Sequence, residues 1–258
     1  MIHLNHSFFV GIINLVINMS LTNKVPEQEV HDLFTRVAPH YDQMNNVISL
    51  GTQKEWRKKF LKELELEPGD FALDLCCGTG DITIALAEKV GPSGNVIGLD
   101  FNQKMLDLAS KKIEKQNLQK EVQLKWGDAM HLSYPNQSFD VVTIAFGLRN
   151  VPDADQVLKE IFRVLKPNGK VGILETSQPT NSIIKLGWKM YFKLFPSFAK
   201  LMRANVSDYQ YLSHTTAKFV SAVQLKQMLE KNGFENIKIS KLNFGAGAIH
   251  IGIKRKMR

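Results

Sequence analysis

Cysteine is almost absent from this sequence: the 258 residues include only Cys76 and Cys77, which are adjacent. Neighbouring cysteines rarely bridge each other, so a disulfide framework is excluded and a reducing cytoplasmic compartment is expected. The metal-binding patterns Cys-x-x-Cys and His-Glu-x-x-His are also missing. We therefore predict that the protein has no metal site.

Long hydrophobic runs are lacking as well. The apolar run from Phe8 to Ile17 is interrupted by Asn14 and is too short to span a bilayer. No Lys or Arg precedes it, as a signal peptide would require. We expect residues 1–22 to be a poorly ordered N-terminal extension and residues 23–258 to form one domain.

Acidic residues are the minority charge, with 25 Asp and Glu against 33 Lys and Arg and a formal net charge of +8. A basic balance suits an anionic partner, which could be nucleic acid, lipid headgroups or a charged small molecule. The charge alone does not choose among these partners.

Strand-like and helix-like segments alternate from Asp70 onward. Strands are expected at residues 71–76, 95–100, 121–126, 139–146 and 170–175, and helices at 81–89, 103–116 and 154–165. This alternation predicts a parallel sheet covered by helices on both faces. A late helix at 221–232 and two closing strands, at 237–242 and 248–253, predict an antiparallel end to the sheet.

Two further segments lie outside this alternation. Residues 23–66 are expected to form a helical collar, with helices at 26–37 and 51–66 and an irregular stretch between them. Residues 180–216 are longer than an ordinary connection, and we expect a helical lid there. Lys185, Lys189 and Lys193 follow one side of that helix, so it could cover an apolar acceptor pocket, lie on a membrane surface, or both.

The end of the first strand has the features of a ligand-binding turn. Asp74 is followed by Gly78 and Gly80, which allow the backbone to turn sharply and approach a ligand. A tight turn with no ligand is the alternative. Asp100, at the end of the second strand, is placed to bind both hydroxyls of a ribose.

Features at the ends of the third and fourth strands strengthen this interpretation. Asp128, followed by Ala129, could reach an adenine amino group, and Ala145, near the end of the fourth strand, is also assigned to the cofactor site. A dinucleotide is less well supported, because the third glycine of the pyrophosphate fingerprint is missing. The four strand ends together favour an adenosyl sulfonium compound.

From residue 65 to about residue 254, the sequence resembles the class I methyltransferases, with Cys76 in the first glycine position of their acid-x-Gly-x-Gly-x-Gly motif. The resemblance implies an α/β, Rossmann-like, seven-stranded and mostly parallel sheet with helices on both faces. It also implies S-adenosyl-L-methionine as cofactor, with Thr79 contacting its methionine part.

Three more motifs are similar to those of the menaquinone and ubiquinone C-methyltransferases. They are Tyr41-Asp42-Gln43-Met44-Asn45 with Trp56, Phe146-Gly147-Leu148-Arg149-Asn150-Val151, and Arg163 to Gly169 followed by Glu175-Thr176-Ser177-Gln178-Pro179. Gln53 and Asn168 depart from that pattern, which usually has His and Gly there. The cysteine pair and the last motif look more like the menaquinone branch.

That resemblance implies methylation of a polyprenylated quinol. Arg149 would supply a cation to a phenolate, Asn150 would orient a water, and Tyr41 would lie over the cofactor mouth. Each residue has a structural alternative. Arg149 could pair with Asp153 or Asp155, Tyr41 and Trp56 could be core residues, and Asp42 could cap a short helix. His214 and His250 are interpreted as structural.

Several alternatives stay open. Within the family, the acceptor could be a ubiquinone-precursor benzoquinol. An RNA methyltransferase would suit the charge, but the fourth strand lacks an Asn/Asp-Pro-Pro-Tyr/Phe motif and no nucleic-acid module is recognisable. A regulatory protein that binds the cofactor without turnover is a third alternative. Peripheral membrane contact and a homodimer are both compatible with the sequence.

Overall fold

The computed structural model describes residues 26–49, 51–179, 181–187, 190, 211, 215–216 and 219–255. The expected extension at 1–22 lies outside these residues. So does most of the expected lid, including Lys189, Lys193 and His214.

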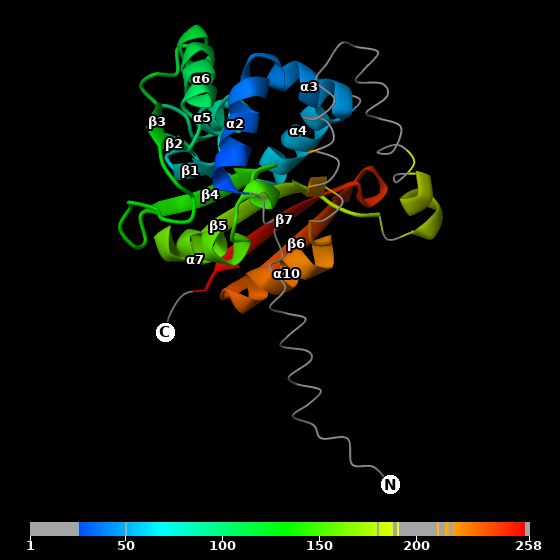
Figure 1. Cartoon of the computed structure of the whole chain (residues 1–258). Helices are drawn as coiled ribbons and strands as arrows, with labels where there is room; N and C mark the ends of the chain where they lie inside the picture. Colours follow the sequence, from blue (N-terminus) through cyan, green and yellow to red (C-terminus); the bar gives the residue numbers. More distant parts are fainter. Residues whose placement is uncertain are drawn as a thin grey trace.

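Seven strands form one sheet with the order β3-β2-β1-β4-β5-β7-β6 (Figure 1). The first five strands pair in parallel, whereas β7 is antiparallel to both β5 and β6. The expected mostly parallel sheet with an antiparallel end is therefore confirmed. The strands are β1 (Phe71–Leu75), β2 (Asn95–Asp100), β3 (Val122–Trp126), β4 (Phe139–Ala145), β5 (Leu165–Thr176), β6 (Phe234–Leu242) and β7 (Gly247–Lys254).

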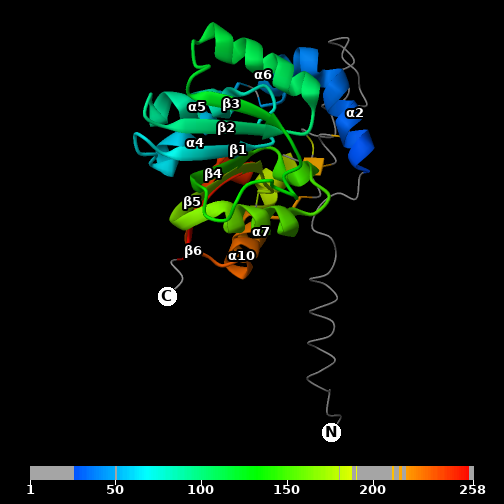
Figure 2. The ribbon, with the colours of Figure 1, turned by 90° about the vertical axis from the view of Figure 1, so that its left-hand side faces the viewer.

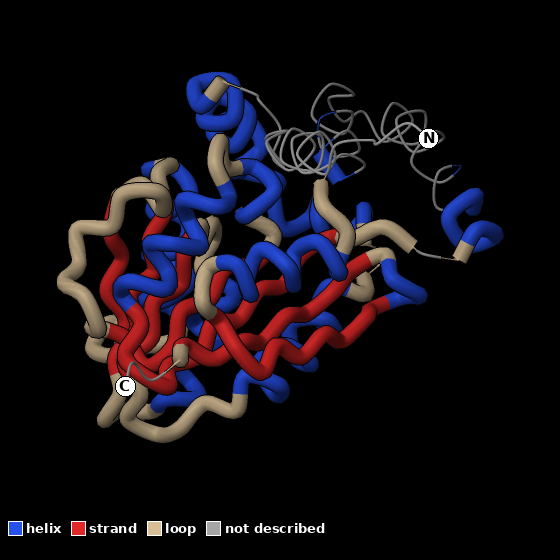
Figure 3. Tube along the Cα trace, turned by 90° about the horizontal axis from the view of Figure 1, so that it is seen from below, coloured by secondary structure: helices blue, strands red, loops and turns tan. Residues whose placement is uncertain are grey.

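Helices cover both faces of this sheet (Figure 2). The helices α4 (Gln53–Leu64), α5 (Asp81–Val90) and α6 (Gln103–Lys115) pack on one face, and α7 (Ala154–Val164) and α10 (Ala222–Lys231) on the other. From below, the strands run side by side through the centre of the structure (Figure 3).

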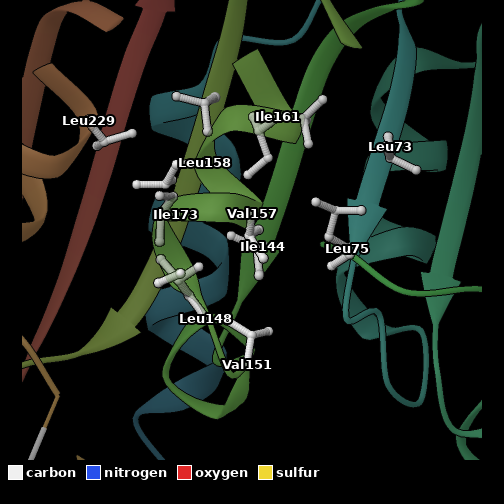
Figure 4. Close-up of a cluster of buried hydrophobic side chains, with 14 of the residues drawn as sticks. Leu73, Leu75, Ile144, Leu148, Val151, Val157, Leu158, Ile161, Ile173 and Leu229 are labelled. Atoms are coloured by element: carbon white, nitrogen blue, oxygen red, sulfur yellow. The ribbon is translucent and has the colours of Figure 1, made fainter. Parts of the chain in front are cut away.

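Alternation along the strands explains why two cores form. Ala72 faces α4 and α5, while its neighbour Leu73 faces α7, because successive side chains point to opposite faces. On the α7 face, Val157, Leu158 and Ile161 are fully buried against the sheet (Figure 4). Burying one such side chain contributes about 1.5–3 kcal/mol, so these clusters hold the strand ends in fixed positions.

The collar contains one more helix than expected. After α2 (Glu27–Val37) and a 3-10 turn at Ala38–His40, residues Tyr41–Ile48 form the helix α3, where the sequence predicted an irregular stretch. Asn45 and Asn46 are weak helix formers, so local propensity does not explain α3. Met44 is buried against Leu33 and Val37 of α2, and this tertiary packing supplies the missing stability.

The strand β5 begins at Leu165, directly after α7, rather than at residue 170 as predicted. Its register with β4 shifts between Phe139 and Val141, and this irregularity accommodates Pro167, which cannot donate to a ladder. Asn168 lies in the same irregularity with a φ of 64°. That left-handed conformation is easiest for glycine and tolerated by asparagine, which accounts for this departure from the family pattern.

No helix in the described part of the chain is both long and apolar enough to cross a membrane.

Candidate functional site

A cavity with about 740 Å³ of empty space opens at the carboxyl ends of the parallel strands. The cavity is lined by residues at or just after the ends of β1, β2 and β4, by the loop after β3, and by the helices α2 and α3. Seven of the predicted site residues line it, namely Tyr41, Gly78, Asp100, Asp128, Ala129, Ala145 and Asn150. Parallel strands end at one edge of the sheet, which is why residues far apart in sequence meet here.

The glycine-rich turn after β1 has the backbone conformation that its sequence predicted. Gly78 and Gly80 have φ angles of 55° and 83°, in the left-handed region that glycine adopts at little cost. Cys76 also lies there, with a φ of 52°, which costs a non-glycine residue about 1–2 kcal/mol. Gly147 accommodates the Cys76 side chain, because a Cβ at residue 147 would lie 2.5 Å from Cys76 Cβ.

Asp100 is buried at the cavity floor. Its Oδ2 accepts a hydrogen bond from the Gly78 N–H at 2.8 Å, and its Oδ1 accepts one from the Asn102 N–H at 2.9 Å. These bonds fix the carboxylate at the junction of β1 and β2. Burial is the main cause that raises its pKa to about 6.

Asp74, Thr79 and Gly80 do not line this cavity, although the sequence grouped them with it. The two carboxylate oxygens of Asp74 accept hydrogen bonds from the hydroxyls of Thr83 and Thr143, at 2.6 and 2.7 Å. Thr79 donates from its hydroxyl to Asp42 at 2.7 Å. Asp74 thus ties β1 to α5 and β4, and Thr79 ties the glycine-rich turn to α3.

Asp128 also lines the cavity, and both of its carboxylate oxygens have partners. Its Oδ1 accepts from the Met130 N–H at 2.8 Å, and its Oδ2 lies 2.7 Å from His131 Nδ1. The hydrogen bond with the Asp128 carboxylate raises the pKa of the exposed His131 ring. The carboxylate therefore lies at the rim of the cavity, next to Ala129 in its wall.

Arg149 lies behind the cavity wall, and its side chain is only 7% exposed. Its guanidinium forms a 2.5 Å ion pair with Glu175 and donates to the Phe146 carbonyl oxygen at 2.8 Å. A structural ion pair was one of the alternatives, but its partner is Glu175 rather than Asp153 or Asp155. Sequence spacing did not indicate Glu175, because the 26-residue separation is closed only by the pairing of β4 with β5.

Asn150 and Tyr41 both line the cavity. The Asn150 side chain donates to the Phe146 carbonyl at 3.1 Å and accepts from the Tyr211 hydroxyl at 3.3 Å. Tyr41 packs beside Phe34 with 6.0 Å between ring centroids. Tyr211 was not singled out from the sequence, since nothing local marks a residue that meets Asn150 in space.

The sequence allowed a structural interpretation of three more residues: Trp56 as a core residue, Asp42 as a helix cap and His250 as a structural histidine. Trp56 does not line the cavity but packs on Phe146 in the core, with ring centroids 6.3 Å apart. Asp42 bonds to Thr79 and to Lys112. His250 Nε2 lies 2.8 Å from the Ala222 carbonyl oxygen, and burial lowers the pKa of its ring, consistent with a structural role.

The rest of the cavity lining is mostly apolar, and the sequence interpretation did not name these residues. They are Val30 and Phe34 from α2, Leu99 from β2, Phe101 and Met105 near the start of α6, and Met130 from the loop after β3. Apolar walls with a few fixed polar groups are typical of small-molecule sites.

The fold is that of the class I methyltransferases. A solved structure described as an S-adenosylmethionine-dependent methyltransferase, possible histamine N-methyltransferase, from Thermotoga maritima superposes with a TM-score of 0.62. It covers 87% of this chain and 99% of its own, at 19% sequence identity. An identity this low supports the fold only.

The chain belongs to the ubiE/COQ5 methyltransferase family, which it matches over residues 22–254. It is 80% identical over 244 residues to a demethylmenaquinone methyltransferase of Lactobacillus johnsonii, covering 95% of this chain and all of that protein. A protein of the same name from Lactiplantibacillus plantarum is 49% identical over 226 residues, covering 87% and 95% of the two chains. The family resemblance stated from the motifs is thereby confirmed.

Proposed function

We propose that this protein transfers a methyl group from S-adenosylmethionine to a ring carbon of reduced demethylmenaquinone. The observation that carries this proposal is the 80% identity to a demethylmenaquinone methyltransferase along that protein's full length. The cavity at the strand ends supplies the mostly apolar walls and the few fixed polar groups of a small-molecule site. The benzoquinol and RNA alternatives have no comparable support.

The residues of the cavity fit an adenosyl compound. The buried Asp100 carboxylate keeps lone pairs for the two ribose hydroxyls, and Asp128 can accept from the adenine amino group beside Ala129. Gly78 lets the ligand approach the turn closely. When bound, S-adenosylmethionine supplies a methyl group on a positively charged sulfur. The protein's main contribution is then to hold the acceptor carbon in line with that methyl group.

Arg149, which lies behind the cavity wall, can favour ionisation of the quinol hydroxyl of the acceptor. The positive charge of Arg149 lowers the pKa of Tyr41 and Tyr211, although burial raises both values overall, that of Tyr211 to about 12. Both side chains are phenols, as is the hydroxyl of a quinol. An acceptor hydroxyl in this cavity would lie in the combined field of Arg149 and its partner Glu175, and ionisation of that hydroxyl makes the neighbouring ring carbon more nucleophilic.

Asn150 is the polar group placed to meet that hydroxyl. Its amide is oriented by Phe146 and Tyr211, so it can position the acceptor hydroxyl or a water that takes the proton. Tyr41 also lines the cavity, next to Gly78. We retain Arg149, Asn150 and Tyr41 as the predicted catalytic group, with Arg149 acting at a distance through its charge.

We also propose peripheral contact with a membrane surface, because a polyprenyl acceptor dissolves in lipid. Ile183 and Leu186, in the helical residues 182–187, are 82% and 61% exposed, and Phe244 is 81% exposed. Residues 181–205 include five basic and no acidic residues. A homodimer stays a prediction that light scattering can check.

The experiment that tests the proposed function measures methyl transfer from labelled S-adenosylmethionine. Reduced demethylmenaquinone, a reduced demethylated ubiquinone precursor and transfer RNA are offered separately. We expect labelled product from the first acceptor only. The Asp100→Asn variant serves as a control and should lose most of the transfer, because its amide cannot accept two ribose hydroxyls as the carboxylate can.

Transfer to the benzoquinol alone would move the acceptor to the ubiquinone branch, and labelled RNA would overturn the quinol altogether. Binding of the cofactor with no product from any acceptor would contradict the proposed acceptor site.

A further inference from the structure

Glu175, near the end of β5, is a buried carboxylate whose two oxygens are both bonded to Arg149. Its side chain is 1% exposed. Its Oε1 lies 2.5 Å from Arg149 Nη1 and accepts from the Thr176 N–H at 2.7 Å. Its Oε2 accepts from the Arg149 backbone N–H at 3.2 Å. One carboxylate thus holds both the backbone and the side chain of the arginine, which fixes the place of the guanidinium.

Arg149 depends on this carboxylate for its position. No other acidic group pairs with Arg149 in the described part of the chain, and its buried Nε has no hydrogen-bond partner there. Arg149 Nη1 also donates to the Phe146 carbonyl oxygen, which accepts from the Asn150 side chain as well. Because Asn150 lines the cavity, the position set by Glu175 extends to a polar group of the proposed acceptor site.

The two charges of the pair act on cavity residues with opposite sign. Arg149 lowers the pKa of Tyr41 and Tyr211, although burial raises both values overall. Burial is the main cause that raises the pKa of the Cys76 thiol, which lines the cavity, and the negative charge of Glu175 adds to that rise. The other charged groups around Cys76 are the carboxylates of Asp74, Asp100 and Asp128, together with Arg57 and Asp81 in a smaller adjoining pocket.

We propose that Glu175 is a positioning residue of the methyl transfer, which holds the Arg149 guanidinium behind the cavity wall and offsets part of its positive charge. The inference rests on the proposed function, because it concerns the action of Arg149 on the acceptor hydroxyl. The methyl donor brings a positively charged sulfur, which an unpaired arginine would repel, whereas an ionised acceptor is stabilised by a positive charge. A paired arginine in a fixed place can serve both, since its field is weakened but keeps its direction.

The first test measures the charge in the cavity without any ligand. Cys76 is alkylated with iodoacetamide in a Cys77→Ala background, which leaves one thiol in the chain, and mass spectrometry follows the rate. Glu175→Gln keeps the size of the side chain and removes its charge, so more of the Cys76 thiol should be ionised. We expect labelling about two- to threefold faster at about pH 8, because the thiolate fraction rises by more than the less basic thiolate loses in nucleophilicity. Arg149→Met should slow the labelling.

The opposite signs separate charge from loosening, because a looser fold would speed labelling in both variants. Faster labelling in both, or no change in either, would overturn the proposal. If Glu175→Gln does not fold, the double variant Arg149→Met/Glu175→Gln removes both charges together and should label Cys76 at nearly the wild-type rate. Glu160→Gln, which removes a glutamate paired with Arg163 outside the cavity lining, is the matched control and should change nothing.

Glu175→Asp tests position separately from charge. The shorter side chain keeps the charge, so Cys76 labelling should stay near the wild-type rate, but it cannot hold Arg149 in the same place. We expect kcat for methyl transfer to reduced demethylmenaquinone to fall about tenfold, with KM for the methyl donor unchanged. Normal wild-type transfer that Glu175→Asp does not change would overturn this inference alone, whereas no transfer by the wild type would overturn the proposed function.

Discussion

Asp74 and Asp100 are two buried carboxylates in neighbouring strands with different surroundings. Both have a pKa raised to about 6, with burial as the main cause. Asp74 accepts from two threonine hydroxyls, whereas Asp100 accepts from two backbone N–H groups and lines the cavity. At the residue scale, only Asp100 is placed to meet a ligand in the main cavity.

The affinity for S-adenosylhomocysteine should therefore depend on pH. Above about pH 6 the Asp100 carboxylate is ionised and accepts the ribose hydroxyls, and below it the carboxyl is protonated and accepts less well. We expect the affinity to fall about fivefold between pH 6 and pH 5, in proportion to the ionised fraction of Asp100, measured by calorimetry from pH 5 to 7.5. Asp74→Asn should keep this dependence, while Asp100→Asn should bind weakly at every pH. A flat wild-type profile would contradict this role for Asp100.

At the scale of elements, one cluster of charges joins three helices to the glycine-rich turn. Lys112 of α6 bonds Asp42 of α3 and Asp81 of α5, and it donates to the Thr79 hydroxyl at 3.0 Å. Thr79 in turn donates to Asp42. Since α3 carries Tyr41 at its first residue, this cluster holds the Tyr41 ring beside Gly78.

Lys112→Met should loosen α3 from the turn, because one substitution removes all three of its contacts. We expect faster amide hydrogen exchange in α3 and unchanged exchange in α7, measured by mass spectrometry. Half-exposed ion pairs are weakened by salt, so high salt should reproduce part of the effect in the wild-type protein. Lys115→Met, one turn along α6, is the control. Unchanged exchange in α3 would argue that packing alone holds this helix.

At the scale of the whole molecule, exposed apolar side chains gather near one end of the sheet. Phe244 lies in the 3-10 turn between β6 and β7, with a left-handed φ of 58°. The adjacent Gly245 lies against Pro179, just before the helical residues 182–187 that carry Ile183 and Leu186 (Figure 1). A strained backbone that presents a phenylalanine to solvent is consistent with a contact surface.

We expect the protein to sediment with vesicles that contain anionic lipid. Phe244→Ser should lower the partition coefficient about 10- to 100-fold, since burying a phenylalanine contributes roughly 1.5–3 kcal/mol. Val223→Ser, which changes an exposed apolar residue of α10 on the face of the sheet that α7 covers, is the control and should have no effect. If Phe244→Ser binds vesicles as well as the wild type does, Phe244 makes no membrane contact.

Much of the sheet and part of the site could be predicted from the sequence. The strand at residues 95–100 has the predicted bounds, because its apolar run is bounded by turn residues on both sides. Asp100 and Asp128 could be assigned to one site, since parallel strands bring their carboxyl ends to one edge. These inferences need only local patterns and a known sheet topology.

The tertiary structure alone decided the contacts that no local pattern encodes. Met44 stabilises α3 from a neighbouring helix, and Glu175 reaches Arg149 only through the pairing of β5 with β4. Whether a polar side chain faces the cavity or the core depends on its neighbours, as the inward bonds of Asp74 illustrate. The sequence determined which residues cluster at the strand ends, because periodicity is local and parallel strands all end at one edge of the sheet. Which of them meet a ligand depends on packing between distant segments.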